Sequence, residues 1–113
     1  MIAKELIKGT IRTIVLSLLA ENRRMYGYEI MQKIDSETGG KVKLTMGSLY
    51  PILHKLEDDG LIYSESESIG KRIRKYYILT TEGEKEKEQK LTELKDFLAT
   101  LNSIIDKGGT AHA

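Results

Sequence analysis

The chain has 113 residues and a formal net charge of +1; 40% of its residues are hydrophobic and 31% are charged. This length leaves room for one domain with a modest core, and the composition is typical of a folded globular protein rather than a disordered one. Because the sequence contains no cysteine, disulfides, thiol nucleophiles and thiolate metal sites are excluded. A net charge this close to zero does not indicate a polyanion as partner, so any such function has to come from local clusters of charge.

The first predicted element is a helix over about residues 4–20, where apolar residues recur at helical spacing. Its apolar part, residues 13–20, follows two lysines, as in a secretory signal. However, Arg12 bounds this run, large Leu18 stands where cleavage needs a small residue, and the run is too short to cross a bilayer. We therefore expect no signal peptide, no membrane anchor and a cytoplasmic location.

A second helix is predicted to open at Tyr26-Gly27-Tyr28 and to end before Gly39-Gly40. Glycine is favoured there because it tolerates the positive φ that follows a helix C-terminus. Beyond it, Lys41–Leu44 alternates polar and apolar residues, which predicts a brief strand.

A third helix is predicted to begin at Thr45 or Ser48, since either hydroxyl can accept a hydrogen bond from a free N–H of the first turn. Pro51 favours Ser48 as the cap, because a proline in the first turn loses no hydrogen bond. Gly60 ends the helix. Its buried stripe is Leu49, Ile52, Leu53 and Leu56.

Two strands follow, at Leu61–Tyr63 and Ile73–Leu79, and Ser68-Ile69-Gly70 joins them into a hairpin. Four cations cluster at the predicted tip and are separated from the acidic residues of the preceding strand: Lys71, Arg72, Arg74 and Lys75. Strand alternation puts Arg72 and Arg74 on one face and Lys71 and Lys75 on the other. A short helix followed by such a wing suits a duplex groove and its phosphates, which predicts a DNA-binding regulator.

A long fourth helix is predicted to be capped by Thr80 or Thr81, to run to about Asp106 and to stop at Gly108-Gly109. It carries the a/d pattern of a coiled coil at Leu91, Leu94, Leu98, Leu101 and Ile105, which Phe97 and Ile104 widen. Leaving this stripe exposed would cost several kcal/mol at about 1.5–3 kcal/mol per side chain. A partner subunit would bury it; alternatively, it folds back on the first helix of its own chain.

The order of three helices and a hairpin predicts a winged helix-turn-helix, a mainly α fold with a small β-hairpin, followed by a long C-terminal dimerisation helix. Four motifs stand in register within this order: Tyr26-Gly27-Tyr28-Glu29-Ile30, Gly47-Ser48-Leu49-Tyr50-Pro51, Leu56-Glu57-x-x-Gly60-Leu61-Ile62, and Arg74-Lys75-Tyr76-Tyr77-x-Leu79-Thr80-x-x-Gly83. Together they closely resemble the PadR family of bacterial transcriptional regulators, in its short branch with a single C-terminal helix.

The resemblance implies a winged helix-turn-helix DNA-binding domain over 1–80, a dimerisation helix over 81–107 and a flexible tail over 108–113. It also implies a homodimer that represses a promoter with two-fold symmetric half-sites, and in many members release by a small effector. A winged-helix adaptor that binds protein instead of DNA remains the alternative.

The residues expected to contact DNA come from the start of the third helix, the wing and their flanks. A helix in the major groove reads base edges with its N-terminal residues, and cations on the wing hold phosphates. Alternatively, Thr45 and Ser48 only cap the helix, Tyr26 and Tyr50 only pack, and the wing cations form an ordinary solvated face. The expected DNA-binding residues are Tyr26, Lys43, Thr45, Ser48, Tyr50, His54, Lys55, Lys71, Arg72 and Arg74.

The expected dimer interface combines the first and last helices, namely Ile7, Ile11, Leu91, Leu94, Phe97, Leu98, Leu101 and Ile105. A small apolar or aromatic effector is expected to bind there, against Ile11, Leu94, Phe97 and Leu98. With no Trp and one Phe in the chain, a planar ligand would find little to stack on.

The sequence offers little enzymatic chemistry. Its two histidines are His54, on the third helix, and His112, in the tail, and neither has a partner at metal-ligand or catalytic spacing. Gly39-Gly40 and Gly108-Gly109 lack the pattern of a phosphate-binding loop. We therefore expect neither enzymatic activity nor a metal or other cofactor.

Overall fold

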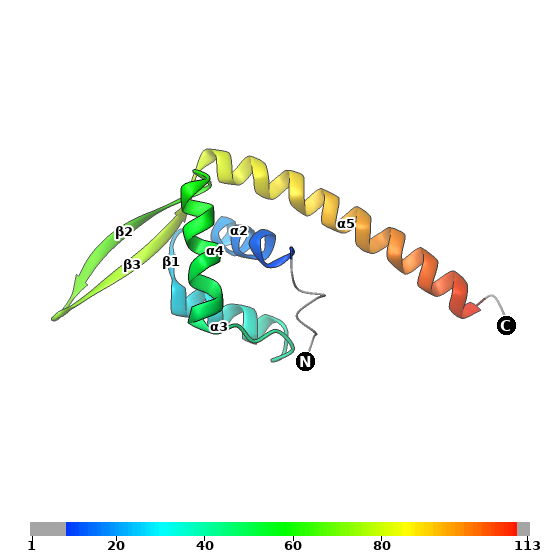
Figure 1. Ribbon diagram of the computed structural model, residues 1–113, viewed down its shortest axis with the longest axis horizontal. Helices are drawn as coiled ribbons and strands as arrows, with labels where there is room; N and C mark the ends of the chain where they lie inside the picture. Colours follow the sequence, from blue (N-terminus) through cyan, green and yellow to red (C-terminus); the bar gives the residue numbers. More distant parts are fainter. Residues whose placement is uncertain (1–8, 111–113) are drawn as a thin grey trace.

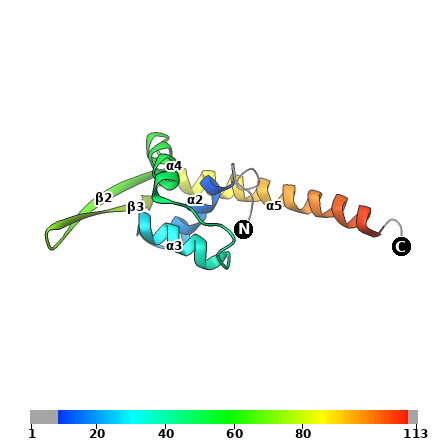
Figure 2. The same ribbon diagram turned by 60° about the horizontal axis from the view of Figure 1, so that its bottom comes forward.

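The computed structural model describes residues 9–110, and the side chains of residues 9–106. In chain order its elements are α2 (Ile11–Glu21), β1 (Met25–Tyr26), α3 (Gly27–Glu37), α4 (Met46–Asp58), β2 (Ile62–Ile69), β3 (Arg72–Leu79) and α5 (Thr81–Thr110). We call α2, α3, α4 and β1 the head, and the β2–β3 hairpin the wing. The wing and α5 leave the head in opposite directions (Figures 1 and 2). The predicted winged helix-turn-helix with a long C-terminal helix is confirmed.

The sheet has three antiparallel strands in the order β1-β3-β2. The wing pairs in register from Ile62 with Leu79 to Ile69 with Arg72, and Gly70, at φ +61°, makes the turn with Lys71. The hairpin is therefore longer than predicted, because β2 continues through the alternating Ser-Glu segment to Ile69. β1 pairs only with Tyr76 and Tyr77, so the outer part of β3 has no neighbour on that side among the described residues.

One hydrophobic core joins the three helices to the base of the wing. Its fully buried side chains come from each helix and from the start of β2, and Tyr77 of β3 lies beside them at 2% exposure. The largest are Leu16, Ile30, Ile34, Leu49, Leu53, Leu56 and Ile62. Because α4 and the wing bury side chains in the same core, their relative position is fixed by packing.

Three predicted elements differ from the structure. The predicted helix over 4–20 is interrupted at Gly9, which has a left-handed φ of +91°, so that α2 begins at Ile11; the part of this prediction on residues 4–8 lies outside the described residues. Lys41–Leu44 is a loop: Val42 is buried, and its N–H donates to Thr38 Oγ1 at 3.0 Å rather than to a strand. The last helix continues through Thr110, because glycine weakens a helix by about 1 kcal/mol per residue but does not end it by itself.

The caps of α4 and α5 are both threonines. Thr45, not Ser48, caps α4, since the Ser48 N–H donates to Thr45 Oγ1 at 3.1 Å. Pro51 therefore lies inside the helix; packing of Met46 on the core fixes the first turn, and burial of Leu49 and Leu53 offsets the lost hydrogen bond. Thr80, one of the two residues predicted to cap α5, accepts from the Gly83 N–H at 3.0 Å.

Candidate nucleic-acid interface

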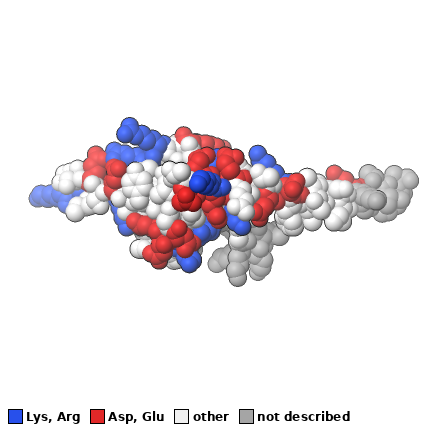
Figure 3. Space-filling model, turned by 90° about the horizontal axis from the view of Figure 1, so that it is seen from above, with Lys and Arg blue, Asp and Glu red and all other residues white. Residues whose placement is uncertain are grey.

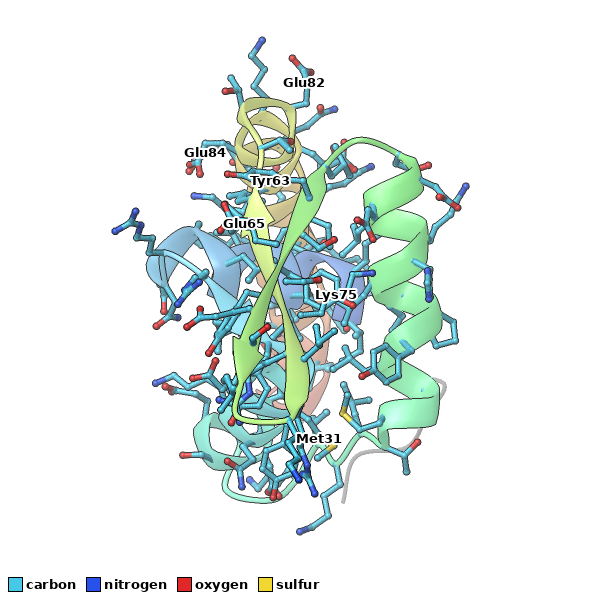
Figure 4. All side chains as sticks on the ribbon, turned by 90° about the vertical axis from the view of Figure 1, so that its left-hand side faces the viewer. Met31, Tyr63, Glu65, Lys75, Glu82 and Glu84 are labelled. Carbon is cyan, nitrogen blue, oxygen red and sulfur yellow. The ribbon has the colours of Figure 1, made fainter. Side chains whose placement is uncertain are left out.

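A groove lies between β3 and the N-terminal ends of α3 and α4. Its volume is about 390 Å³, and its walls include Tyr26, Met46, Tyr50, Arg72 and Arg74. The wing and α4 thus lie on the same side of the molecule, with Lys75 directed into the space between them (Figure 4). A recognition helix and a wing can share one duplex only from one side, so this arrangement is the one that DNA binding requires.

Strand alternation sorts the wing into two chemically different faces. Toward α4, the serines of β2 stand opposite Ile73, Lys75 and Tyr77 of β3. Contacts to Glu57 of α4 define this side: Ser64 Oγ donates to Glu57 Oε2 at 2.8 Å, and Lys75 Nζ lies 3.7 Å from Glu57 Oε1. The acidic residues of β2 therefore point away from the groove, as Glu65 does in Figure 4.

On the opposite strand face, a ladder of arginine and tyrosine side chains joins the wing to β1, and its Tyr26–Arg74 end also borders the groove. The guanidinium carbon of Arg24 lies 4.0 Å from the ring centroid of Tyr76, and that of Arg74 lies 4.0 Å from the centroid of Tyr26. The two rings meet edge to face at 5.7 Å, and Arg24 also pairs with Glu67 of β2 at 2.7 Å. Cation–π and edge-to-face contacts of this kind stabilise a fixed orientation. They set the angle of the wing relative to α3.

Two groups of the wing have perturbed pKa values. A side-chain hydrogen bond with Tyr76 is the main cause that raises the pKa of Arg74, so its charge is retained. Burial raises the pKa of Tyr77, consistent with its place in the core. Neither shift provides a group that would gain or lose a proton near neutral pH.

The outward face of α4 is polar and open. Ser48, Pro51, His54 and Lys55 are exposed, and Tyr50 is 45% exposed beside the groove. Thr45 Oγ1 is occupied as the helix cap and also lies 3.1 Å from Ser48 Oγ, so these two hydroxyls form one polar unit. The structure thus brings together the α4 residues that the sequence singled out, with Tyr26 at the edge of the same groove.

The predicted cations differ in how they are held. Among the described residues, Lys71 and Arg72 form no ion pair, whereas Lys43 pairs with Asp35 at 3.5 Å and Lys55 with Asp59 at 3.3 Å. Such exposed pairs contribute little and can be exchanged for a phosphate. In Figure 3, Lys and Arg atoms lie at the tip of the wing beside uncharged atoms, and most Asp and Glu atoms gather over the body of the molecule. The local charge pattern therefore favours the wing as the point of contact with a polyanion.

The chain is similar to known proteins over most of its length. Residues 15–89 match the family model described as "Transcriptional regulator PadR-like family". The chain belongs to this family. It is 34% identical over 109 residues to the transcriptional regulator Rv3488 of Mycobacterium tuberculosis, covering 96% of this chain and 94% of that protein.

Solved structures place the PadR-like fold over most of the chain. A transcriptional regulator from Clostridium thermocellum superposes with a TM-score of 0.83 at 34% identity, covering 91% of this chain and 97% of that one. A PadR family transcriptional regulator from Eggerthella lenta gives 0.79 at 28% identity, covering 89% and 86%. The chain is therefore a PadR-like winged-helix regulator of transcription and not an enzyme. In the described part of the chain, no helix is long and apolar enough to span a membrane.

The expected dimer residues of this PadR-like chain fall into three groups. Leu91 and Leu94 are half-buried in the part of α5 nearer the head, where α2 packs against α5. Ile11 is 6% exposed and belongs to the core of its own subunit, which leaves little of it for a partner or ligand; Ile7 lies outside the described residues. The remaining members are exposed to different degrees: Phe97 61%, Leu98 49%, Leu101 39% and Ile105 59%, with Ile104 beside them at 64%.

The sequence did not indicate the residues that orient the wing. Arg24 and Tyr76 build the ladder, and Glu57 anchors the groove face of the wing through Ser64 and Lys75. The signal for the two faces was present in the strict Ser-Glu alternation of β2, which sorts hydroxyls from carboxylates. No signal in the sequence pairs Arg24 with Tyr76, because that contact depends on the register of β1 with β3.

Proposed function

We propose that the chain is a homodimeric, sequence-specific repressor of transcription that acts in the cytoplasm and is released from DNA by a small apolar effector. The observation that carries the proposal is the common groove between α4 and the wing, with free cations at one edge and the polar face of α4 at the other. The opposite arrangement, with these elements on different sides, would have left no surface for one duplex.

In this proposal α4 enters the major groove. Ser48, Tyr50 and His54 meet base edges, since hydroxyl and imidazole groups can donate or accept there. Lys71 and Arg72 hold phosphates beside the wing, with Arg74 adding charge from its place on Tyr26. Thr45 supports Ser48. Tyr26, Lys43 and Lys55 would contact the DNA backbone at the edges of the site.

Dimerisation follows from the exposed stripe on α5. A helix of 30 residues is about 45 Å long at roughly 1.5 Å per residue. The molecule measures 64 × 29 × 20 Å, so α5 is longer than both of its shorter dimensions. Its far half therefore extends past the head, and a second copy is the partner that offers a matching stripe. Two heads joined in this way could occupy half-sites about 34 Å apart, one turn of the duplex.

An effector is proposed at the seam between subunits, against Leu94, Phe97 and Leu98. These side chains are apolar and at least partly exposed in the single chain, so a ligand could be enclosed when two copies meet. Release from DNA requires that the ligand binds one spacing of the two heads more tightly than the other. Repression would then follow from occupation of a promoter, and its relief from the changed spacing.

A salt titration of DNA binding tests the proposal. The affinity for a specific duplex should fall with a log–log slope of roughly −0.9 per phosphate neutralised. Replacing Lys71 and Arg72 by Ala should weaken all duplexes alike and reduce the slope by about 2. Replacing Ser48 or Tyr50 should instead change the preferred bases.

The matched control is Lys85→Ala with Lys95→Ala, which removes the same charge from α5 and should leave the slope unchanged. Equal, sequence-blind losses from the α4 and wing variants would contradict the division of roles. Failure to bind any duplex at low salt would contradict DNA binding and favour the protein-binding adaptor.

A further inference from the structure

One exposed apolar side chain has no role in the fold or in the proposed grip on phosphates. Ile73, near the tip of the wing, is 75% exposed, the largest value among the exposed large hydrophobic residues of the described chain. The next most exposed ones, Ile104, Phe97 and Ile105, lie on α5, where a partner subunit would cover them. On the wing, Ile73 stands among cations instead, and the packing of the head does not require it.

The register of the wing sets the direction of Ile73. It is the second residue of β3, opposite Ser68, and shares its face with Lys75 and Tyr77. This is the face that looks toward α4, because Lys75 pairs with Glu57 and Tyr77 is buried against the core. The neighbours on β2 are short serines, so the branched side chain of Ile73 stands above them toward the groove side.

We propose that Ile73 is a specificity-determining residue, an apolar wedge that enters the minor groove of DNA next to the major groove occupied by α4. This inference rests on the proposed function. Lys71 and Arg72 flank the wedge, and cations at a wing tip favour the strong negative potential of a narrow minor groove. Against phosphates an isoleucine would gain nothing, whereas the sugar walls and base-step edges of the minor groove are apolar enough to bury it.

The wedge would read sequence in a different way from α4. Insertion between base pairs requires partial unstacking, and pyrimidine–purine steps unstack most easily. A G·C pair also places an amino group on the floor of the minor groove, in the path of the side chain. The wing would therefore prefer A·T-rich DNA with a flexible step at its own position, without a hydrogen bond to any base.

The test uses the full-length protein and the duplex that it enriches from a random pool. Ile73→Ala should bind this duplex about tenfold more weakly, the amount expected for losing most of one buried aliphatic side chain. The salt slope should stay unchanged, and the bend measured by circular permutation electrophoresis should decrease. Ile73→Thr, which keeps a β-branched residue in the strand, should show the same losses, and Ile73→Val should retain most of the affinity.

The matched control is Ile69→Ala, which removes the same side chain from the other face of the hairpin, where Ile69 pairs with Arg72 and borders the groove; its effect on affinity and bend should be clearly smaller than that of Ile73→Ala. A second arm replaces A·T pairs under the wing by inosine·cytosine pairs, which keep the minor-groove pattern of A·T and carry the major-groove pattern of G·C. Binding should survive this change and weaken with G·C. Unchanged affinity and bend in Ile73→Ala, or an equal effect from Ile69→Ala, would overturn the wedge. Enrichment of no duplex would instead overturn the proposed function.

Discussion

The head and the far half of α5 differ in how far their apolar side chains are buried. In the head, Val15, Ile30 and Leu53 are completely buried within one chain. On α5, the large apolar residues from Phe97 to Ile105 remain 39–64% exposed. Since burying such a side chain is worth about 1.5–3 kcal/mol, the head reaches its stable packing alone, whereas α5 gains most of its stabilisation only from another surface. The stability of the head should therefore not depend on protein concentration, whereas that of α5 should increase with it.

The largest expected effect is on assembly. Replacing both Leu101 and Ile105 by Glu would place charges inside the proposed seam, where an unpaired carboxylate is strongly disfavoured. The apparent mass in sedimentation should halve, and affinity for a two-site operator should fall by about two orders of magnitude as the second head is lost. The head should stay folded, because neither residue is part of its core.

The control for this prediction adds the same charge elsewhere on α5. Thr100 and Ser103 are exposed and lie off the apolar stripe, so replacing both by Glu should leave the mass unchanged. If the two double variants behaved alike, the stripe would not be the seam, and the contrast between head and α5 would fail.

The next largest effect is on the core of the head. Leu53 is 0% exposed on the inner side of α4, so Leu53→Ala should lower the free energy of unfolding by about 2–5 kcal/mol. The loss should not depend on protein concentration. Leu98→Ala, on α5, should by contrast be destabilising only where dimer forms. Urea unfolding of both variants at two protein concentrations measures the difference directly.

Gly83 sharpens the comparison at the junction between the two regions. A Cβ at this position would lie 2.0 Å from Leu61 O and 2.6 Å from Leu79 Cδ1, so Gly83→Ala forces α5 away from the sheet. We expect a loss of about 1–3 kcal/mol, although alanine normally favours a helix over glycine. Gly47→Ala is the control: its Cβ would meet only Thr45 Oγ1 at 3.7 Å, and this variant should not be destabilised. An equal loss of stability in Gly47→Ala would show that the close approach of Leu61 is not what makes Gly83→Ala destabilising.

A smaller effect is expected at the start of α4. Thr45→Ala removes the acceptor for the Ser48 N–H and should cost about 1 kcal/mol, measured by thermal or urea unfolding. Thr45→Ser should keep the cap. Because Ser48 Oγ also contacts Thr45, the alanine variant should further alter base preference; an unchanged preference would mean that the cap does not position Ser48.

The contrast between regions also explains which predictions from sequence succeeded. Heptad spacing and the helical stripe of Leu49, Leu53 and Leu56 are local patterns, and the elements that they indicated are present. The cap of α4 was predicted wrongly because the rule about Pro51 is local, whereas the packing of Met46 on the core decides where the helix begins.

Other features of the site depend on residues far apart in the sequence. The contact of Arg24 with Tyr76, and of Lys75 with Glu57, follows from sheet register and the approach of α4, which no spacing along the chain encodes. Lys41–Leu44 shows the reverse error, since its alternation reflects one buried valine in a loop rather than a strand. Local patterns therefore predicted the elements of the site, and tertiary packing supplied the contacts that orient them.

The smallest expected effect comes from an ion pair that ties α2 to the end of α4. Arg12 Nη2 lies 2.6 Å from Asp59 Oδ2, and this hydrogen bond is the main cause that lowers the pKa of Asp59 below its ordinary 3.8. In the unfolded chain the carboxyl takes up its proton at a higher pH than in the folded one. The stabilisation is therefore present above the unfolded value of 3.8 and is lost as the pH falls through the lower folded value.

Asp59→Asn should be slightly less stable than the parent chain at neutral pH and equally stable in acid, while the neighbouring Asp58→Asn should show no such convergence. High salt should shrink the difference at neutral pH, because both partners are partly exposed. A difference that persisted in acid would mean that the Asp59 side chain supports α4 by its shape rather than by its charge.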